Sequence, residues 1–342
     1  MGYRYIGSKA RIAQAIMNYI GKPKGNGYFI DAFSGTGAVA ERAADLGWRV
    51  KINDMMKSAV IMSEARLLSE KDISFEKVGG YTNCITYLNS LEGIEGFIWK
   101  EYSPASKREV GIERKYFSEE NAKKIDVIIK AIQKWVREKA ITEKEYTLLM
   151  MNLISAVNEV ANIAGTYGCF LSKWCEQANN TLELQTMPLR SEKVQYIGMN
   201  MDVFEVDSNC EDVVYLDPPY TKRQYASYYH ILETIVCGDM PVVEGVSGLR
   251  PWKEKASVFC YKTKALQALT ELITSQKAHR VVLSYSNEGH IELDDLIKEL
   301  KLYGKVKLVE LSTIGRYTPN KVAVSNNTEV KEFLIDFRKR KD

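Results

Sequence analysis

The residues best suited to chemistry form one tetrapeptide, Asp217-Pro218-Pro219-Tyr220, directly after the apolar run VVYL. Two successive prolines fix the backbone φ angle twice and remove two N–H groups, so this segment is stiff and presents its carbonyls outward. The Asp217 carboxylate and the Pro218 carbonyl are two hydrogen-bond acceptors, and Tyr220 adds a flat ring for stacking. Two acceptors beside a ring match an exocyclic amino group on an aromatic base.

A glycine-containing loop far upstream supplies a second candidate site. The segment Asp31-Ala32-Phe33-Ser34-Gly35-Thr36-Gly37 follows an apolar run and precedes a helical stretch. Its glycines permit a tight turn and the close approach of a ligand to the backbone. Asp54 ends the next apolar run, where a carboxylate accepts hydrogen bonds from ribose hydroxyls. With Ala40 the loop also fits G-x-G-x-x-A, so loop and acid indicate an adenosine-containing ligand, either a dinucleotide or S-adenosylmethionine.

Alternating strands and helices must position these residues. The pattern predicts a mostly parallel, doubly wound α/β sheet, whose carboxyl edge is where such folds bind ligands. The glycine loop, Asp54 and Asp217 all fall at predicted strand ends. Strands are predicted at 28–33, 48–54, 194–199, 212–217, 280–286, 305–312 and 332–337, and helices follow several of them, including 225–236 and 291–301.

The middle of the chain has a different character. Apolar residues recur with helical spacing in 118–140 and in 141–165, which predicts two long packing helices. The stretch 102–117 interleaves Lys107, Arg108 and other bases with aromatics, a pattern that suits contacts to phosphates and bases and equally suits a solvated loop. Residues 1–74 and 191–342 are therefore predicted to form one discontinuous domain, with 75–190 as a mainly helical insertion.

Composition narrows the class of protein. The 342 residues are 45% hydrophobic and 27% charged, which indicates a folded globular chain, and a net charge of +3 excludes a bulk polycation. Six cysteines without a CxxC pair and only three histidines predict neither a disulfide framework nor a metal site. The most apolar stretch, LLMMNLISAV, is about half a membrane span. We expect a cytoplasmic protein that does not enter the membrane.

Taken together, these motifs resemble those of the S-adenosylmethionine-dependent DNA adenine-N6 methyltransferases of the Dam-like α group. Within it the sequence is most similar to modification enzymes of type IIS restriction systems. The order of cofactor motifs, long insert and DPPY is that of the α group. The matching segments are Arg4–Lys9, Asp31–Gly37, Asn53-Asp54, Asp217–Tyr220 and Ser284–Ser286.

The resemblance implies a Rossmann-like methyltransferase fold with an antiparallel last strand, and it assigns roles to individual residues. Lys9 would bind the methionine carboxylate, Asp54 the ribose and Asp202 the adenine amino group of the cofactor. The remaining implied cofactor contacts are Tyr5, Asp31, Phe33, Gly35, Gly37 and Asp217. The implied catalytic residues are Asp217, Pro218, Pro219 and Tyr220, and the implied DNA contacts are Arg223, Arg316 and Lys321, with Lys107 and Arg108 in an insertion that would recognise the target sequence.

The implied reaction needs neither a metal nor a covalent enzyme intermediate. Asp217 and the Pro218 carbonyl would localise the lone pair of a flipped-out adenine amine, which then attacks the sulfonium methyl group directly. Double-stranded DNA is the implied partner, a separate restriction endonuclease is a possible one, and we expect a monomer.

Other readings of the residues remain open. A dehydrogenase would explain the glycine loop and Asp54 but not the DPPY segment. Methyl transfer to RNA, to protein or to the N4 amino group of cytosine shares the same geometry, although Asp217 at the head of the tetrapeptide favours adenine. A non-catalytic DNA-binding relative predicts the loss of Lys9, Gly35, Asp54 or Asp217, and all four are present.

Overall fold

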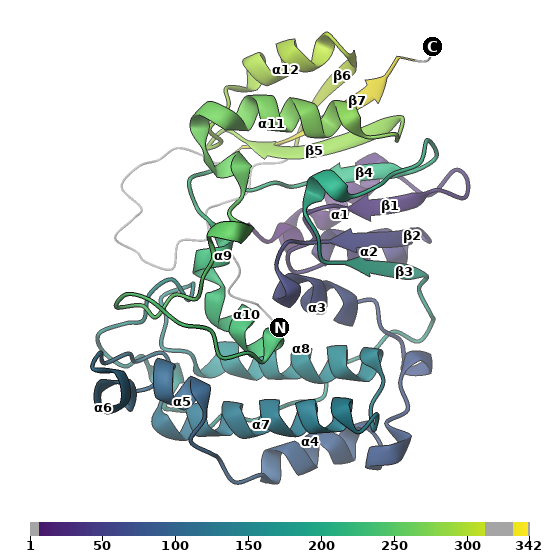
Figure 1. The fold of residues 1–342 in the computed structure, drawn as a ribbon. Helices are drawn as coiled ribbons and strands as arrows, with labels where there is room; N and C mark the ends of the chain where they lie inside the picture. The colour runs from purple at the N-terminus through teal and green to yellow at the C-terminus, as the bar shows by residue number, and fades with distance from the viewer. Residues whose placement is uncertain (1–6, 312–330, 341–342) are drawn as a thin grey trace. The chain divides into compact units, whose positions relative to one another are not determined.

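The computed structural model describes residues 7–311 and 331–340. The predicted site residues Tyr5, Arg316 and Lys321 lie outside these ranges. Within them, every helix is too short or too polar to cross a bilayer. The described chain forms two compact units, each made of stretches that are separate in the sequence. The colours of Figure 1 give the position of each stretch along the chain. The sheet unit comprises Gly7–Ser63, Val194–Tyr225 and the described residues from Lys255 onward, and the helical unit comprises Glu64–Lys193 and Ala226–Glu254.

The segment 226–254 belongs to the helical unit, whereas the sequence-based boundaries placed it with 191–342. Hydrogen bonds to an upstream part of the helical unit explain this assignment. The Arg114 guanidinium donates to the carbonyl oxygens of Gly245 and Val246 at 3.0 and 3.2 Å. The Tyr102 hydroxyl donates to the carbonyl of Gly248 at 3.0 Å.

One seven-stranded sheet, ordered β3-β2-β1-β4-β5-β7-β6, forms the centre of the sheet unit (Figure 1). The pairs β3–β2, β2–β1, β1–β4 and β4–β5 are parallel, and β7 is antiparallel to both of its neighbours. This topology confirms the predicted doubly wound, mostly parallel α/β sheet with an antiparallel last strand. The strands are β1 (Tyr28–Asp31), β2 (Arg49–Asn53), β3 (Tyr196–Met199), β4 (Val213–Leu216), β5 (Arg280–Ser286), β6 (Gly304–Glu310) and β7 (Glu332–Lys339).

Successive side chains of each strand point to opposite faces of the sheet, and both faces are buried. Ile30, Val214 and Leu283 face a core completed by the apolar sides of α11 and α12. Phe29 and Tyr215, on the alternate positions of β1 and β4, stack with ring centroids 6.0 Å apart. Because both faces are covered, the central strands are continuous apolar runs, which is why they are readable from sequence. The helices of this unit are α1 (Ala13–Ile20), α2 (Ala38–Asp45), α3 (Lys57–Ala65, which runs into the helical unit), α11 (Lys262–Ser275) and α12 (Leu293–Lys301).

Two long helices, α7 (Glu119–Arg137) and α8 (Glu143–Val160), form the centre of the helical unit and confirm the predicted pair. Ser118 caps α7 by accepting a hydrogen bond from the Asn121 N–H, and Thr142 with Glu145 forms a capping box at the start of α8. The shorter helices are α4 (Tyr81–Ser90), α5 (Phe97–Tyr102), α6 (Ser106–Val110) and α10 (His230–Cys237).

The helix predicted over 225–236 is interrupted. It forms α9 (Tyr225–Tyr228) and α10, separated by Tyr229, whose ψ of 22° leaves the helical range. His230, at the start of α10, is fully buried and its Nε2 lies 2.9 Å from the Tyr167 carbonyl oxygen. Burial lowers the pKa of this imidazole to about 3, so His230 is a neutral core residue.

Candidate active site

The predicted cofactor and catalytic residues of the sheet unit gather at the carboxyl edge of the parallel strands. The glycine loop follows β1, Asp54 follows β2, Asp202 follows β3 and Asp217 follows β4. These four strands are neighbours in the order β3-β2-β1-β4, so their ends lie side by side. A site at this edge is the arrangement that doubly wound sheets use for nucleotide-like ligands.

The glycine loop is shaped by two left-handed residues and held by the next strand. Gly35 and Gly37 have φ values of +51° and +75°. A Cβ atom on Gly37 would lie 2.6 Å from the Cα of Ser63, so only glycine fits this turn. Asp54 Oδ2 accepts a hydrogen bond from the Gly35 N–H at 3.0 Å. The ribose acid predicted from sequence therefore also fixes the shape of the loop.

Two asparagines tie the ends of β1, β2 and β3 together. The Asn53 side chain donates to the carbonyls of Ala32 and Met201, each at 3.2 Å. Asn200 donates to the Asp54 carbonyl at 2.8 Å. These bonds place the loop that carries Asp202 next to Asp54. The sequence did not single out Asn200, because nothing in its neighbourhood distinguishes it from an ordinary loop asparagine.

An aromatic cluster lies on the same edge. The Phe33 ring meets the Phe259 ring edge to face at 5.6 Å, and Phe204 stacks on Phe259 at 6.0 Å. Asp202 is exposed and accepts a hydrogen bond from the Phe204 N–H at 3.0 Å. A partly exposed ring beside a carboxylate suits a purine that carries an amino group. Phe259 was missed because its segment carries no recognised motif, and Phe204 was missed although it lies only two residues after the predicted Asp202.

Lys9 contacts both end residues of the Asp217–Tyr220 tetrapeptide. Its Nζ is 3.3 Å from Asp217 Oδ1 and 3.1 Å from Glu332 Oε2. It also donates to the Tyr220 hydroxyl at 3.3 Å, and the residue is only 7% exposed. The Tyr220 ring is further fixed by an edge contact with Tyr285 at 5.4 Å. All of these residues except Glu332 belong to segments that match the family motifs.

Glu332 is another site residue that sequence reasoning missed, and the one that contacts Lys9 directly. It is the first residue of β7 and pairs with Ser286 across the antiparallel β5–β7 register. That register closes a separation of more than forty residues, which no local pattern encodes. One signal was available in the sequence: the last apolar strand begins with an acid, and charged residues are rarely buried unless they are paired.

Burial dominates the electrostatics of this edge. It raises the pKa of Asp217 to about 7, with Lys9 opposing the shift and Glu332 adding to it. It also raises the pKa of Asp31 to about 8, assisted by the charge of Asp217. Although burial opposes a charged ammonium, Asp217, Tyr220 and Glu332 hold the pKa of Lys9 well above its usual value. Lys9 is therefore a permanent cation, whereas the two aspartates titrate near neutral pH.

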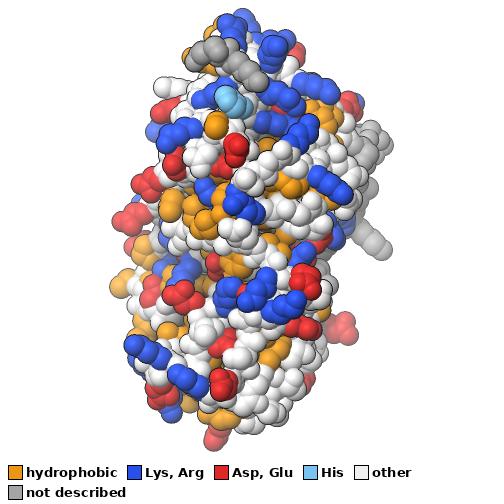
Figure 2. All heavy atoms as spheres, turned by 90° about the vertical axis from the view of Figure 1, so that its right-hand side faces the viewer, with side chains coloured by type: hydrophobic (Ala, Val, Ile, Leu, Met, Phe, Trp, Pro, Cys, Tyr) orange, Lys and Arg blue, Asp and Glu red, His pale blue; other side chains and the backbone are white. Residues whose placement is uncertain are grey.

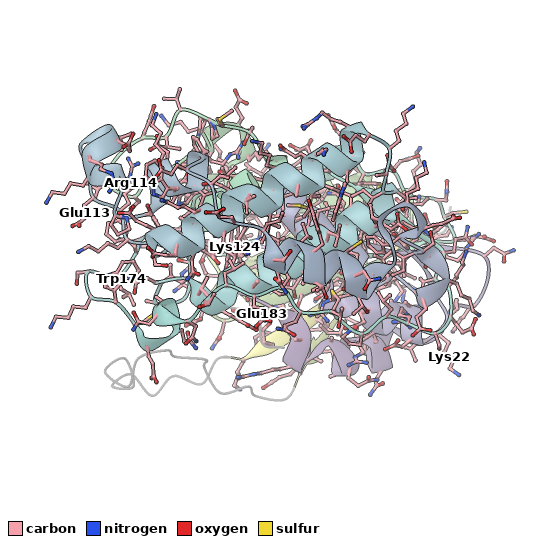
Figure 3. The ribbon with its side chains drawn as sticks, turned by 90° about the horizontal axis from the view of Figure 1, so that it is seen from below. Lys22, Glu113, Arg114, Lys124, Trp174 and Glu183 are labelled. Carbon is pink, nitrogen blue, oxygen red and sulfur yellow. The ribbon has the colours of Figure 1, made fainter. Side chains whose placement is uncertain are left out.

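The interpretation of 102–117 as an exposed basic and aromatic surface is wrong for four of its residues. Tyr102, Tyr116 and Phe117 are fully buried. Arg114 (labelled in Figure 3) is 3% exposed, and its NH1 lies 2.6 Å from Glu101 Oε2. The physical reason for the burial of Arg114 is that its guanidinium donates hydrogen bonds to the carbonyls of residues 245 and 246, which lie more than a hundred residues away in the sequence.

The predicted DNA-contact residues that the structure describes are exposed but differ in their surroundings. Arg108 forms a two-pronged pair with Glu119, at 3.0 and 2.8 Å, and lies 5.0 Å over the Trp99 ring. Lys107 is exposed on α6, and Arg223 is exposed three residues after Tyr220. Figure 2 shows Lys and Arg side chains interspersed with acids on the viewed face, rather than gathered into one continuous patch.

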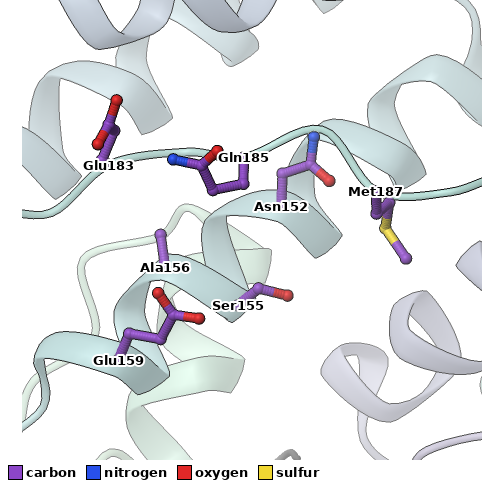
Figure 4. Close-up of a pocket in the computed structure, with 7 residues that line it drawn as sticks. All are labelled: Asn152, Ser155, Ala156, Glu159, Glu183, Gln185 and Met187. Atoms are coloured by element: carbon purple, nitrogen blue, oxygen red, sulfur yellow. The ribbon is translucent and has the colours of Figure 1, made fainter. Parts of the chain in front are cut away.

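A small pocket lies within the helical unit, and none of the predicted site residues lines it (Figure 4). Asn152 is buried in its wall, and its Nδ2 lies 2.7 Å from the Tyr81 hydroxyl. The pocket is lined by Asn152, Ser155, Ala156, Glu159, Glu183, Gln185 and Met187.

Comparison with known proteins adds an independent line of evidence. The model of the D12 class N6 adenine-specific DNA methyltransferase family matches residues 5–298. The chain is 33% identical to modification methylase StsI of Streptococcus sanguinis over 98% of its length, and 34% identical to type II methyltransferase M.FokI of Planomicrobium okeanokoites over 88%. It spans about half the length of both, 52% and 47%. It is also 32% identical to type II methyltransferase M.NlaIII of Neisseria lactamica, over 90% of each chain.

Proposed function

Because the chain belongs to the D12 class N6 adenine-specific DNA methyltransferase family, we propose that it transfers a methyl group from S-adenosylmethionine to the N6 amino group of an adenine in double-stranded DNA. The observation that carries this proposal is the position of Asp217-Pro218-Pro219-Tyr220. The tetrapeptide follows the buried strand β4, beside the glycine loop of β1, and its carboxylate is held by a buried lysine.

The residues at the strand ends fit the cofactor. Asp31 is 1% exposed, and its Oδ1 has no hydrogen-bond partner among the described residues, so a ligand that donates to it would satisfy a buried acceptor. Asp54 retains lone pairs for ribose hydroxyls beyond those that bind the loop N–H groups. Phe33, Gly35, Gly37 and Asp202 complete the proposed cofactor site. When bound, the cofactor supplies an electrophilic methyl group on a cationic sulfur.

Asp217 and the Pro218 carbonyl activate the target amine. The lone pair of an exocyclic amine is delocalised into the base, and two acceptors on its N–H groups favour a more pyramidal nitrogen with a localised lone pair. Tyr220 stacks on the base and holds the nitrogen in line with the methyl group. The base must leave the duplex for its amino group to reach Asp217, at a cost of a few kcal/mol. Pro219 keeps the segment rigid while the base enters.

We further propose that the protein is the modification arm of a restriction system, with a separate endonuclease, and that it acts as a monomer in the cytoplasm. The helical unit, including 75–190, is proposed to recognise the target sequence. Lys107, Arg108 and Arg223 are proposed to contact DNA phosphates. The two further proposed contacts, Arg316 and Lys321, lie outside the described residues.

The deciding experiment measures transfer of a labelled methyl group from S-adenosylmethionine to unmethylated bacterial DNA, followed by digestion to nucleosides. We expect N6-methyldeoxyadenosine as the product. Asp217→Ala should lower the rate by about a thousandfold or more, because one of the two acceptors is lost. Asp207→Ala is the matched control, since Asp207 is an exposed acid of the same unit whose carboxylate pairs with the surface residue Lys277.

Near wild-type transfer by Asp217→Ala would refute the catalytic assignment. If the label is recovered in N4-methyldeoxycytidine, or only when RNA is the acceptor, the protein is a methyltransferase that acts on a different substrate from the one proposed. No transfer to any nucleic acid by a protein that binds the cofactor would favour a non-catalytic DNA-binding role.

A further inference from the structure

Lys9 is shared by two carboxylates that come from different strands. Asp217 follows β4 and Glu332 begins β7, and their oxygens lie 3.3 and 3.1 Å from the same Nζ. The side chains of Lys9, Asp217 and Glu332 are only 6%, 14% and 12% exposed, so water screens their charges weakly. The proposed reaction uses Asp217 and leaves Glu332 without a part.

The ammonium of Lys9 has three polar neighbours. It donates hydrogen bonds to Glu332 Oε2 at 3.1 Å and to the Tyr220 hydroxyl at 3.3 Å. Asp217 Oδ1 lies 3.3 Å from the same Nζ as an ion pair, and this buried oxygen has no hydrogen-bond partner among the described residues. Lys9 is therefore enclosed by the residues of the tetrapeptide and Glu332, and the Asp217 oxygen remains an acceptor for a ligand.

The charges of this cluster matter because methyl transfer moves a positive charge. The reaction begins with a cationic sulfonium and places a positive charge on the attacking nitrogen, next to Asp217. The charges of one ammonium and one carboxylate cancel. Lys9 and Asp217 alone would therefore have no net charge to stabilise the positive charge on the attacking nitrogen. Adding Glu332 gives the three groups a net charge of −1 in a weakly solvated place, where charge interactions are strong.

The sheet holds Glu332 rigidly in this position. Residues 280–286 of β5 pair with 332–338 of β7 without interruption, and Glu332 lies opposite Ser286. Its carbonyl accepts a hydrogen bond from the Leu311 N–H at 2.8 Å. Lys9 is anchored from the other side, since the neighbouring Ser8 hydroxyl lies 3.1 Å from the Thr36 hydroxyl in the glycine loop.

We propose that Glu332 is a positioning residue that acts as the counter-ion of Lys9, so that the negative charge of Asp217 remains available to the cationic methyl donor and to the reacting amine. This inference rests on the proposed function. It explains why a second acid is buried beside the catalytic tetrapeptide. It also predicts that the site distinguishes ligands by charge.

A binding experiment tests this without catalysis. S-adenosylmethionine carries a sulfonium charge, and S-adenosylhomocysteine has a neutral sulfur in its place. Calorimetry with wild type and Glu332→Gln should show that the variant loses about tenfold in affinity for the charged ligand relative to the neutral one. An unchanged affinity ratio would overturn the proposal.

Asp336→Asn is the matched control. Asp336 is buried in the same strand, 3.0 Å from Arg280 NH2 and 2.9 Å from the Tyr19 hydroxyl. The change is equally isosteric, and we expect it to lower the melting temperature while leaving the affinity ratio unchanged. Glu332→Asp keeps the charge and should keep most of the wild-type ratio. This second variant separates the role of charge from a loss of packing.

A double-mutant cycle in the methyl-transfer assay tests the pairing itself. Glu332→Gln should lower kcat about tenfold when Lys9 is present, with little change in KM for DNA. In a Lys9→Met background the same substitution should lower kcat by less than about twofold, because no charge is left to offset. Equal effects in both backgrounds would refute the counter-ion role. If wild type binds neither ligand, the proposed function itself fails, whereas binding with an unchanged ratio removes only the present inference.

Discussion

At the scale of single residues, the site depends on how burial sets the charge of its acids. In the proposed reaction Asp217 must be a carboxylate to accept hydrogen bonds from the amine with full strength, yet burial favours its neutral form. Lys9 favours the carboxylate and Glu332 opposes it, and together they leave the pKa of Asp217 at about 7. The groups that face this cluster are Lys9, Asp31, Tyr215, Tyr220 and Glu332.

The activity should therefore depend on pH around neutrality. Because the pKa of Asp217 is raised, the carboxylate is lost as the pH falls through about 7. We expect kcat/KM, which reports the free enzyme, to fall about tenfold per pH unit below that value and to level off above it. Glu332→Gln should move the midpoint to lower pH, since the charge of Glu332 raises the pKa of Asp217. Profiles measured from pH 5.5 to 8.5 check this, and a flat wild-type profile would contradict it.

At the scale of elements, the strands, the glycine loop and the helices α7 and α8 could be predicted because their signals are local. Three apolar runs end in Asp31, Asp54 and Asp217. Because the strands that they form are parallel, the three acids lie at the same edge of the sheet. Glu332 could not be placed in this way, since its contact with Lys9 depends on the β5–β7 register. Arg114 was misread for the same reason, because its partners at 245–246 are distant in sequence.

The glycine loop gives an element-scale prediction. Gly37→Ala should lose the left-handed backbone conformation and also push against Ser63, costing about 2–5 kcal/mol of unfolding free energy. Gly47→Ala is the control, because Gly47 has a φ of +90° but no atom within 4 Å of the position that an added Cβ would take, and only about 1–2 kcal/mol should be lost. Urea unfolding measures both. Cofactor binding should fail only in Gly37→Ala, and equal binding by the two variants would show that the loop does not shape the site.

At the scale of the whole chain, 342 residues with a net charge of +3 are divided into a sheet unit and a helical unit. The chain passes between them at 63–64, 193–194, 225–226 and 254–255. The crossings at 193–194 and 225–226 flank the segment that contains β3, β4 and the Asp217–Tyr220 tetrapeptide. Tyr220, which is proposed to stack on the target base, therefore precedes the crossing at 225–226 by only a few residues in the sequence.

The proposed binding of DNA by a nearly neutral chain requires a few well-placed cations, and the structure distinguishes two of the proposed contacts. Arg108 is already paired with Glu119 at 2.8 Å, so a phosphate would have to compete with that carboxylate. The Arg223 side chain is exposed, and no ion pair of this residue is seen within residues 7–311 and 331–340. We expect Arg223→Gln to reduce the slope of log affinity against log salt by about 1, as expected for one lost phosphate contact. Arg108→Gln should change the slope by clearly less. Titrations of a duplex at several salt concentrations measure both slopes, and a larger effect of Arg108→Gln would show that DNA displaces Glu119 and that α6 is the stronger contact.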